Sequence, residues 1–352
     1  MNWKWYLSDL KDVPKNGLKV FSCFSCGGGS TMGYKLAGCT VLGNVEIDDK
    51  MNKLYKKNHD PKYNFKMDIR KFKDIPNDEL PEELFDLDIL DGSPPCSSFS
   101  MAGSREKGWG KKKKFKEGQA LQTLDDLFFD FIDVVEKLKP KVVIAENVKG
   151  MIAGNAKGYV REIVKRYKQA GYETQLFLLN GALMGVPQAR ERVFFVSRRM
   201  DLNMPKVKMD FREKPVTFGE VEANISSSIG KPISQNLRQY YFKCLAGKSL
   251  STVHPKGSYF NYSKLHKERV APTVTAADNN LMHYKEAYYL SDHAIISLQS
   301  FPQDYDFMDQ KVQYVCGMSV PPLMMKGVAG EVVRQCFGKE LAAHGNSKAE
   351  NR

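Results

Sequence analysis

Two side chains in this sequence could carry out covalent chemistry, and each follows a short apolar run. The first is Cys96, which comes after the run at 86–90 and a rigid Pro94-Pro95 turn. The second is Glu146, which follows the apolar run at 141–145. A thiol that attacks and a carboxylate that holds a proton are the groups that nucleophilic attack on a pyrimidine ring needs.

Each of these residues also has an ordinary structural interpretation. A free thiol is most often a buried, inert cysteine, and a carboxylate at a strand end is often half of an ion pair. The polar, turn-like surroundings of Cys96 favour a reactive role. Arg190 and Arg192 alternate, so both side chains can point to one face. One of them could brace Glu146 or a substrate phosphate.

A second group of residues has the order expected for a nucleoside cofactor. Gly27, Gly28 and Gly29 follow an apolar run and precede a helix signal, so the backbone could approach a ligand at a helix N-terminus. Glu46 follows the next apolar run, where a carboxylate can hold ribose hydroxyls. Asp68 could accept a hydrogen bond from an adenine amino group. This order predicts a cofactor such as S-adenosylmethionine.

These residues need a scaffold, and the first half of the chain alternates strand and helix signals. The segment 121–138 has apolar residues three and four apart and ends before Pro140, which predicts an amphipathic helix. Further strands are expected at 18–22, 41–47, 86–90, 142–145, 173–179 and 193–197, and further helices at 30–37 and 159–170. This alternation predicts an α/β fold with a mostly parallel sheet, whose ligand site lies at the carboxyl ends of the strands.

The composition limits the class of protein. The chain has 352 residues, 42% of them hydrophobic, and a formal net charge of +12. This excess favours nucleic acid as a partner, although a generally Lys-rich proteome would produce it too. The 7 cysteines are scattered and odd in number, which favours a reducing cytoplasm over a disulfide framework. No apolar run has the ~18 residues of a membrane span, and we expect no secretory signal and no metal site.

The pattern changes after Ser197. Residues 198–268 are basic and rich in Asn, Ser and aromatic residues, which suits contact with nucleic acid but also an ordinary insertion with a solvated surface. We therefore expect a first domain at 1–197 and a small irregular domain at 198–268. A return segment at 269–343 would complete the first domain, and 344–352 would form a disordered tail.

Five motifs, in this order, resemble those of the DNA cytosine-5 methyltransferases. They are Phe24-Ser-Cys-Gly-Gly-Gly29, Gly92-Ser-Pro-Pro-Cys96, Glu146-Asn147-Val148, Gln188-x-Arg190-x-Arg192 and Arg269-x-x-x-Thr273-x-Thr275. The resemblance covers roughly residues 18–335. It implies an S-adenosylmethionine-dependent, Rossmann-like sheet with helices on both faces and a small target recognition domain. It also implies S-adenosylmethionine as methyl donor, S-adenosylhomocysteine as product and no metal.

The resemblance further implies roles for individual residues. Cys96 would attack C6 of a cytosine, and Glu146 would hold or protonate N3. Arg190 would orient this assembly and contact the base, with Arg192 as a further catalytic residue. The implied cofactor residues are Phe24, Ser25, Gly28, Gly29, Glu46, Ile47, Asp68, Ile69, Gly92, Pro94 and Ser319. The implied DNA contacts are Ser97, Ser98, Arg105, Lys111, Lys112, Gln188 and Thr273, several of them in a candidate lid at 97–118.

As a member of this family, the protein would flip its target base out of double-stranded DNA at a short specific sequence. The resemblance implies a bacterial or phage restriction–modification enzyme, monomeric and cytoplasmic, with a separately encoded restriction endonuclease and no membrane association. Two alternatives stay open. One is a tRNA cytosine-5 methyltransferase of the same architecture, and the other is a non-catalytic DNA-binding relative.

Several positions depart from the family pattern, among them His293-Ala294 where the family has Arg-Glu. Cys26 stands where the family has a glycine, Met318 where it has an asparagine, and Ser297 where it has an arginine. Cys96, Glu146 and Arg190 match the pattern. The departures therefore concern cofactor affinity, or the identity of the transferred group, more than the nucleophile.

Overall fold

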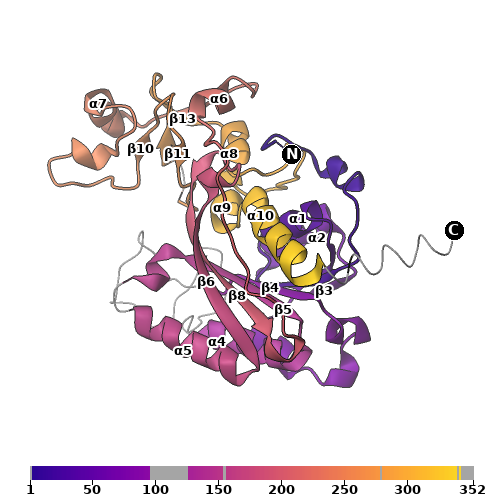
Figure 1. Ribbon diagram of the computed structural model, residues 1–352. Helices are drawn as coiled ribbons and strands as arrows, with labels where there is room; N and C mark the ends of the chain where they lie inside the picture. The colour runs from indigo at the N-terminus through magenta and orange to yellow at the C-terminus, as the bar shows by residue number, and fades with distance from the viewer. Residues whose placement is uncertain (1, 96–125, 154–155, 278–279, 339–340, 342–352) are drawn as a thin grey trace. The chain divides into compact units, whose positions relative to one another are not determined.

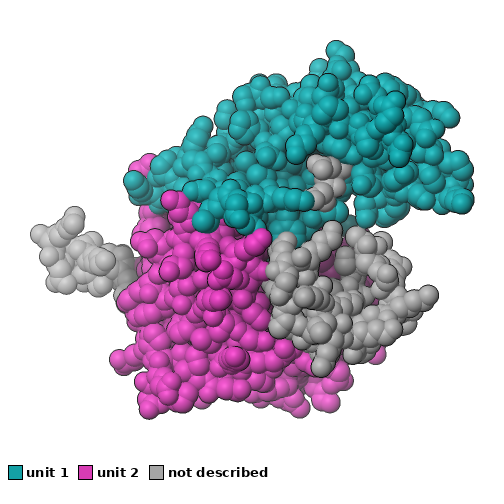
Figure 2. Space-filling view, turned by 180° about the vertical axis from the view of Figure 1, so that it is seen from behind, with its two compact units in different colours: residues 1–11, 180–191, 211–324 teal, residues 12–179, 192–210, 325–352 magenta. Residues whose placement is uncertain are grey.

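The computed structural model describes residues 2–95, 126–153, 156–277, 280–338 and 341. The chain divides into two compact units, which are coloured separately in Figure 2. Unit 2 consists of Asp12–Leu179, Arg192–Asp210 and Met325–Arg352, and unit 1 of Met1–Lys11, Asn180–Glu191 and Phe211–Met324. These boundaries differ from the expected ones. Residues 198–210 belong to unit 2, whereas 269–324 belong to unit 1 together with the expected recognition region.

A seven-stranded sheet forms the centre of unit 2, with strand order β3-β2-β1-β4-β5-β8-β6 (Figure 1). The strands are β1 (Lys19–Cys23), β2 (Thr40–Val45), β3 (Tyr63–Phe65), β4 (Ile89–Gly92), β5 (Val142–Val148), β6 (Tyr172–Asn180) and β8 (Glu191–Arg199). The first five strands in this order pair in parallel, and β8 runs antiparallel to β5. The expected α/β class with a mixed, mostly parallel sheet is confirmed.

Helices connect and cover these strands. They are α1 (Gly29–Leu36), α2 (Asp49–His59), α3 (Ile69–Asp74), α4 (Leu127–Leu138), α5 (Ala156–Gln169) and α10 (Pro322–Val332). The expected helix at 121–138 is described from Leu127 onward, and its first residues lie outside the described part of the chain. Lys139 ends α4 in a left-handed conformation, and Pro140 follows, so the helix cannot continue.

Alternate residues of the central strands face a large apolar core. Phe21, Leu90, Val143 and Phe195 belong to this core together with Phe131 and its neighbours on α4. Since successive side chains of a strand point to opposite faces of the sheet, the residues between them point to the other face. That other face carries the polar residues of the candidate site.

Unit 1 is built from shorter elements. Its strands are β7 (Gln188–Ala189), β9 (Ile229–Pro232), β10 (Ser263–Lys264), β11 (Ala271–Pro272), β12 (Leu281–Met282) and β13 (Tyr288–Leu290), and its helices are α6 (Phe218–Glu222), α7 (Gln235–Lys243), α8 (Asp292–Leu298) and α9 (Val312–Met318). Four strands pair in the order β10-β12-β13-β9. A small separate core around Leu237, Tyr241 and Leu250 supports them.

Short helical turns complete the chain. They are η1 (Leu7–Lys11), η2 (Asn77–Glu79), η3 (Glu82–Phe85), η5 (Lys149–Ile152), η6 (Gly181–Leu183), η7 (Met200–Leu202), η8 (Leu250–Thr252) and a π-helical turn, η9 (Val333–Phe337). None of the helices in the described residues combines the length and the apolar character that crossing a membrane requires.

The beginning of the chain packs within unit 1. The Trp5 side chain is 1% exposed, and its indole Nε1–H donates to the carbonyl oxygen of Ser300 at 2.9 Å. The backbone N–H of Gln303 donates to the carbonyl oxygen of Trp5 at 2.9 Å. The backbone N–H of Leu7 donates to Oδ1 of Asp304 at 2.7 Å. Segments nearly the whole chain length apart are therefore joined by one buried side chain and three hydrogen bonds.

Candidate active site

A row of polar side chains crosses the sheet of unit 2 near the carboxyl ends of its strands. Ser22 on β1 lies opposite Asp91 on β4, and β4 pairs with β5 so that Gly92 lies opposite Ala145. Glu146 on β5 lies opposite Phe194 on β8. Because side chains alternate along a strand, Ser22, Asp91 and Glu146 point to the face opposite the apolar core. This is the edge where parallel sheets bind ligands.

Glu146 is one of two charged partners at this edge. The Arg192 guanidinium Nε lies 2.9 Å from Oε1 of Glu146, and the two side chains are 14% and 11% exposed. Burial lowers the pKa of Arg192 from its ordinary value, and the Glu146 carboxylate opposes this shift. Arg192 stays charged near neutral pH because the ordinary pKa of arginine is so high. The pair therefore orients the Glu146 carboxylate at the end of β5.

Asn147 ties the end of β5 to the segment that leads to Cys96. Its side-chain Nδ2–H donates to the carbonyl oxygen of Pro94 at 3.0 Å, and the Asn147 side chain is buried. Pro94, expected beside the cofactor, therefore uses its carbonyl oxygen in a bond within the site. Cys96 itself lies outside the described residues, as do the expected DNA contacts Ser97, Ser98, Arg105, Lys111 and Lys112.

Arg190 lies in unit 1 and has different partners from Arg192. Its Nη1 donates to the carbonyl oxygen of Val274 at 2.9 Å, and its Nη2 donates to those of Gly317 and Ser319 at 3.0 and 3.1 Å. Arg190 is only 2% exposed. The carboxylate that Arg190 was expected to orient is bonded by Arg192 instead. The geometry of Arg190 is that of a group that fixes three backbone carbonyls.

Gln188 is bonded in a similar way, although we expected it to contact DNA. Its Nε2 donates to the carbonyl oxygen of Leu298 at 2.7 Å, and its Oε1 accepts from the backbone N–H of Val274 at 3.0 Å. The Thr273 hydroxyl donates to the carbonyl oxygen of Ala189 at 3.1 Å. Gln188 is fully buried and Thr273 is half-buried. Both residues join strand β7 to the segment around β11 within unit 1.

The glycine-rich turn between β1 and α1 has an unusual backbone. Phe24 and Cys26 adopt left-handed conformations with φ of 57° and 44°, and Gly28 has φ of 74°. Cys26, in the position of a family glycine, thus keeps the conformation that glycine adopts most easily. A Cβ atom on Gly28 would lie 2.0 Å from Nε2 of His59, so this position also has no room for a side chain. Burial lowers the pKa of His59 to about 3, so its ring is neutral.

Glu46 supports this turn from the end of β2. Its Oε2 accepts the backbone N–H of Cys26 at 2.8 Å, and its Oε1 accepts that of Asp48 at 2.9 Å. Burial raises the pKa of Glu46, and the two amide bonds oppose the shift. Asn44 donates to the Ser25 hydroxyl at 2.9 Å. The turn is therefore fixed by hydrogen bonds from β2.

The other expected cofactor residues lie at helix starts or strand ends of unit 2 or, for Ser319, in unit 1. Gly29 begins α1, Ile69 begins α3 and is buried, and Ile47 is half-buried. A Cβ atom on Gly92 would lie 2.5 Å from the Phe131 ring, so Gly92 allows α4 to approach β4 closely. Ser319 is buried in unit 1, where its carbonyl oxygen accepts bonds from Arg190 and Gln299.

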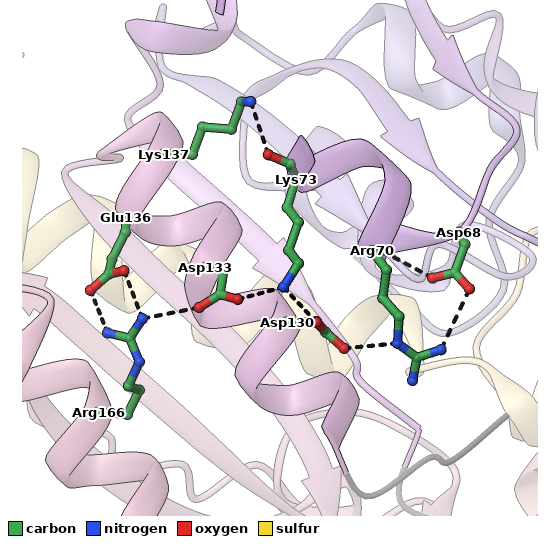
Figure 3. A network of polar contacts seen from close by, with 8 residues as sticks. All are labelled: Asp68, Arg70, Lys73, Asp130, Asp133, Glu136, Lys137 and Arg166. Carbon is green, nitrogen blue, oxygen red and sulfur yellow. Dashed lines mark hydrogen bonds and ion pairs between the residues drawn. The ribbon is translucent and has the colours of Figure 1, made fainter. Parts of the chain in front are cut away.

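Asp68 belongs to a chain of ion pairs that Figure 3 shows in full. It caps α3 by accepting the backbone N–H of Arg70 at 2.9 Å, and it lies 3.6 Å from the Arg70 guanidinium. Arg70 also pairs with Asp130 on α4 at 3.1 Å, and Lys73 lies between Asp130 and Asp133 at 2.9 and 2.7 Å. Asp133 connects the chain to Arg166 on α5 and, through Arg166, to Glu136 on α4, while Lys137 on α4 donates to the carbonyl oxygen of Lys73 at 3.0 Å.

Asp91 is a buried acidic residue that the sequence interpretation did not single out. Its Oδ2 accepts the Ser22 hydroxyl at 2.7 Å, and its Oδ1 accepts the Tyr34 hydroxyl on α1 at 3.2 Å. A carboxylate inside an otherwise apolar strand is costly unless it is bonded, so its position in Ile-Leu-Asp-Gly was an available signal. Within the described residues, no group of histidine, cysteine or acidic side chains has a geometry that could hold a metal ion.

Comparisons with known proteins give the family. A model of the C-5 cytosine-specific DNA methylases matches residues 18–334. The chain is 35% identical to the type II methyltransferase M.FnuDI of Fusobacterium nucleatum over 198 residues, 55% of this chain and 51% of that protein. In such matches the chain spans about half the length of the curated relatives. It is 30% identical to M.NgoFVII of Neisseria gonorrhoeae over 337 residues, 87% of this chain and 84% of that protein.

A solved structure gives the same fold. The crystal structure of a protein described as a DNA modification methyltransferase encoded within an E. coli prophage is similar to this chain with a TM-score of 0.70. The two are 18% identical, and the match covers 91% of this chain and 99% of that one. The family model matches residues 18–334, which include all seven strands of the large sheet. The chain belongs to the C-5 cytosine-specific DNA methylase family.

Proposed function

We propose that the protein is a DNA cytosine-5 methyltransferase that acts on a cytosine flipped out of duplex DNA within a short specific sequence. Family membership supports the reaction class. The observation that carries the proposal is the Glu146 carboxylate at the end of β5, which is buried and paired with Arg192 at 2.9 Å. A carboxylate fixed in this way can hold a proton at one defined atom of a base.

The residues of this chain divide the chemistry between them. The Cys96 thiolate forms a bond to C6, and the electron pair of the C5–C6 double bond moves into the ring. Glu146 donates a proton to N3, so negative charge does not accumulate on the ring. C5 then carries the nucleophilic electron pair. Arg192 keeps the Glu146 carboxylate in place during this step.

S-adenosylmethionine, when bound, supplies a methyl group on a positively charged sulfur and leaves as S-adenosylhomocysteine. After methylation, a base removes the proton from C5 and the C5–C6 double bond re-forms. The Cys96 sulfur leaves as thiolate, and N3 returns its proton to Glu146. The enzyme is thereby restored without a metal ion.

The described residues fit this cofactor. The Glu46 carboxylate accepts two backbone N–H groups and has lone pairs left for ribose hydroxyls. Gly28 caps α1 without a side chain, so the first amides of the helix face the turn. The Asp68 side chain is 21% exposed, which leaves its carboxylate accessible to an adenine amino group. We assign Phe24, Ser25 and Gly29 to the same site.

We propose that unit 1 supplies the DNA-reading surface. Its segment Phe211 to 268 contains exposed apolar side chains beside lysines: Phe242 is 65%, Leu245 is 74% and Phe260 is 68% exposed. Exposed aromatic residues among cations suit nucleic-acid contact. Gln188 and Thr273 would act here by fixing the backbone that presents this surface.

We further propose that the protein works as a monomer in the cytoplasm on double-stranded DNA, beside a separately encoded restriction endonuclease. Support comes from the relatives M.FnuDI and M.NgoFVII, which are named type II methyltransferases. Measuring the size of the purified protein tests whether it is a monomer. Digesting methylated DNA with candidate endonucleases tests whether such a partner exists.

A covalent trap tests the reaction. Duplex oligonucleotides that carry 5-fluorocytosine in varied contexts are incubated with the protein and S-adenosylmethionine. Fluorine cannot leave C5 as a proton would, so the Cys96–C6 bond persists and an adduct survives denaturation. We expect the adduct with the full chain and none with Cys96→Ala. An adduct on 5-fluorocytosine tRNA but on no DNA would refute the DNA substrate, and an adduct with Cys96→Ala would refute the nucleophile.

Glu146→Gln tests the proton donor. The amide keeps the shape of the side chain but cannot transfer the proton, so we expect the rate of methyl transfer to fall by several orders of magnitude, on the order of 10² to 10⁴. DNA affinity, measured by fluorescence anisotropy, should change little. A rate near that of the unmodified protein would exclude this role for Glu146.

A further inference from the structure

One carboxylate of unit 2 is hydrogen-bonded to residues before and after the glycine-rich turn and is not part of the chemistry described above. Asp91 is 1% exposed on β4. Its two oxygens accept the Ser22 hydroxyl at 2.7 Å and the Tyr34 hydroxyl at 3.2 Å. The nearby Ser30 side chain lowers the pKa of this carboxylate as well. Asp91 therefore accepts hydrogen bonds from hydroxyl groups of two different elements, β1 and α1.

These hydroxyl groups lie on both sides of the turn in sequence. Ser22 is in β1, directly before the turn, whereas Ser30 and Tyr34 are in α1, directly after it. Between them, Phe24 and Cys26 hold left-handed conformations. Such conformations persist in non-glycine residues only where the surroundings determine them strongly. A single carboxylate that joins the entry and the exit of the turn supplies such a constraint.

We propose that Asp91 is a positioning residue for the cofactor, which it serves by joining β1 to α1 and so fixing the turn between them in its binding conformation. The inference rests on the proposed function, because it concerns the turn to which we assign the cofactor. It deepens that function by naming what pre-organises the turn. Asp91 acts through the hydroxyl groups of Ser22 and Tyr34, whose hydrogen bonds it accepts.

A carboxylate suits this position better than a neutral acceptor would. An ionised carboxylate accepts several hydrogen bonds at once, and bonds to a charged acceptor are the stronger ones. The first turn of α1 lies close by, and a helix N-terminus favours negative charge. An asparagine has only one acceptor oxygen, so it could not accept the hydroxyls of Ser22 and Tyr34 on separate oxygens.

The surroundings of Asp91 make this constraint dependent on pH. Burial raises the pKa of Asp91 to about 7, the hydroxyl bonds oppose the shift, and the negative charge of Glu146 adds to it. The other titratable groups that interact with Asp91 are Cys23 on β1, Tyr34 on α1 and Tyr55 on α2. Burial raises the pKa of all three, so they stay neutral near pH 7.

The direction of the pH effect follows. Above pH 7 the Asp91 carboxylate is ionised and both oxygens accept. Below pH 7 it is protonated, one oxygen becomes a donor, and at least one hydroxyl loses its acceptor. We therefore expect cofactor affinity to be full above pH 7 and to weaken as the pH falls below 7.

Calorimetric titration of the full chain with S-adenosylhomocysteine, without DNA, tests the proposal between pH 6 and pH 8.5. We expect Asp91→Asn to raise Kd about tenfold at pH 8, the effect of losing roughly one charge-assisted hydrogen bond. The remaining affinity should no longer change around pH 7. Tyr34→Phe removes a single bond and should raise Kd by a smaller factor. In the double variant, Tyr34→Phe should not raise Kd further than Asp91→Asn does alone.

Asp88→Asn is the matched control. Asp88 lies just before the same strand, at its opposite end, and is 8% exposed. It accepts the backbone N–H of Lys19 at 2.8 Å and pairs with Lys141 at 2.9 Å. This variant should lose stability without a change in cofactor Kd or in its pH dependence.

The possible outcomes separate the two proposals. If Asp91→Asn lowers the melting temperature as Asp88→Asn does but leaves Kd and its pH dependence unchanged, Asp91 is only structural and the inference fails. If Asp91→Asn does not fold, Tyr34→Phe decides in the same way. If the unmodified chain does not bind the cofactor at any pH, the proposed function fails and this inference with it.

Discussion

At the scale of single residues, Arg190 and Arg192 show how two positions of one motif can have unrelated partners. Arg192 pairs with Glu146 in unit 2, whereas Arg190 bonds three backbone carbonyls in unit 1. The strand alternation that places both on one face does not decide which carboxylate or carbonyl each side chain reaches. The difference is testable, because a change at Arg192 should affect the rate of methyl transfer and a change at Arg190 should affect stability.

Lysine substitutions should separate the two roles. Arg192→Lys keeps the charge but loses the Nε donor to Glu146, so we expect methyl transfer to slow by about 10²-fold with little loss of stability. Arg190→Lys cannot reach three carbonyls, so we expect the free energy of unfolding to fall by about 3 kcal/mol. Single-turnover rates and urea unfolding measure the two effects. A loss of stability in Arg192→Lys together with a loss of rate alone in Arg190→Lys would contradict these roles.

Gly28 is a second residue whose identity the backbone dictates. An alanine there would combine φ of 74° with a Cβ atom 2.0 Å from the His59 ring. We expect Gly28→Ala to destabilise unit 2 by about 2–4 kcal/mol and to weaken cofactor binding. Gly158→Ala is the control, because that helical glycine has nothing within 4 Å of its Cβ position. It should stabilise the protein by about 0.5–1 kcal/mol in thermal unfolding; equal effects of the two changes would contradict the argument.

At the scale of elements, the ion pairs of Figure 3 join α3, α4 and α5 across one face of the sheet. Lys73 lies between Asp130 and Asp133, so its removal leaves two carboxylates without that cation. Asp130 keeps Arg70 as a partner, but it is only 12% exposed, so losing one of its cations is costlier there than at the surface. The network therefore stabilises the packing of these helices more than pairs at the surface do.

Lys73→Met tests the network. We expect it to lower the free energy of unfolding by about 1–3 kcal/mol in urea, and the loss to persist in high salt, which screens a partly buried pair only weakly. Lys53→Met is the control, since the Lys53–Asp49 pair on α2 is 65% and 52% exposed. That change should cost less than about 0.5 kcal/mol. A similar cost for both would show that burial does not matter here.

The element pattern could be predicted from the sequence where the periodicity was clear. The strands around Phe21, Ile144 and Phe195 and the helix that contains Phe131 follow from apolar runs and a helical spacing. Helix α2 was not predicted, because its Lys-rich sequence has few apolar positions, although Asp48 caps it with two backbone bonds. Unit 1 was expected only as irregular, because strands of two to four residues carry no readable alternation.

The site could be predicted in part for a similar reason. Glu146 was found because a carboxylate ends an apolar strand, and its partner among the arginines was left open. Asp91 was missed although its place in an apolar strand was a signal, because its hydroxyl partners on β1 and α1 lie far from it in sequence. Contacts of this kind depend on strand order, and no local pattern reports them.

At the scale of the whole molecule, the net charge of +12 predicts how binding responds to salt. Cations that replace counterions on phosphates make DNA affinity fall steeply with salt. We expect DNA Kd to rise at least about 10²-fold between 50 and 200 mM salt. S-adenosylhomocysteine Kd, measured in parallel, should change little. A DNA Kd that does not change with salt concentration would mean that the positive charge lies away from the DNA contact.

The packing of Trp5 depends on a residue that is synthesised much later. Its partner Ser300 is 295 residues away along the chain. A ribosome that adds roughly 5–20 residues per second needs about 15–60 s to reach that partner. Throughout this time Trp5 lacks its native partner, so the newly made segment around it exposes an indole ring to whatever chaperone meets it first. The segment around Trp5 is thus made long before the residue that completes its packing.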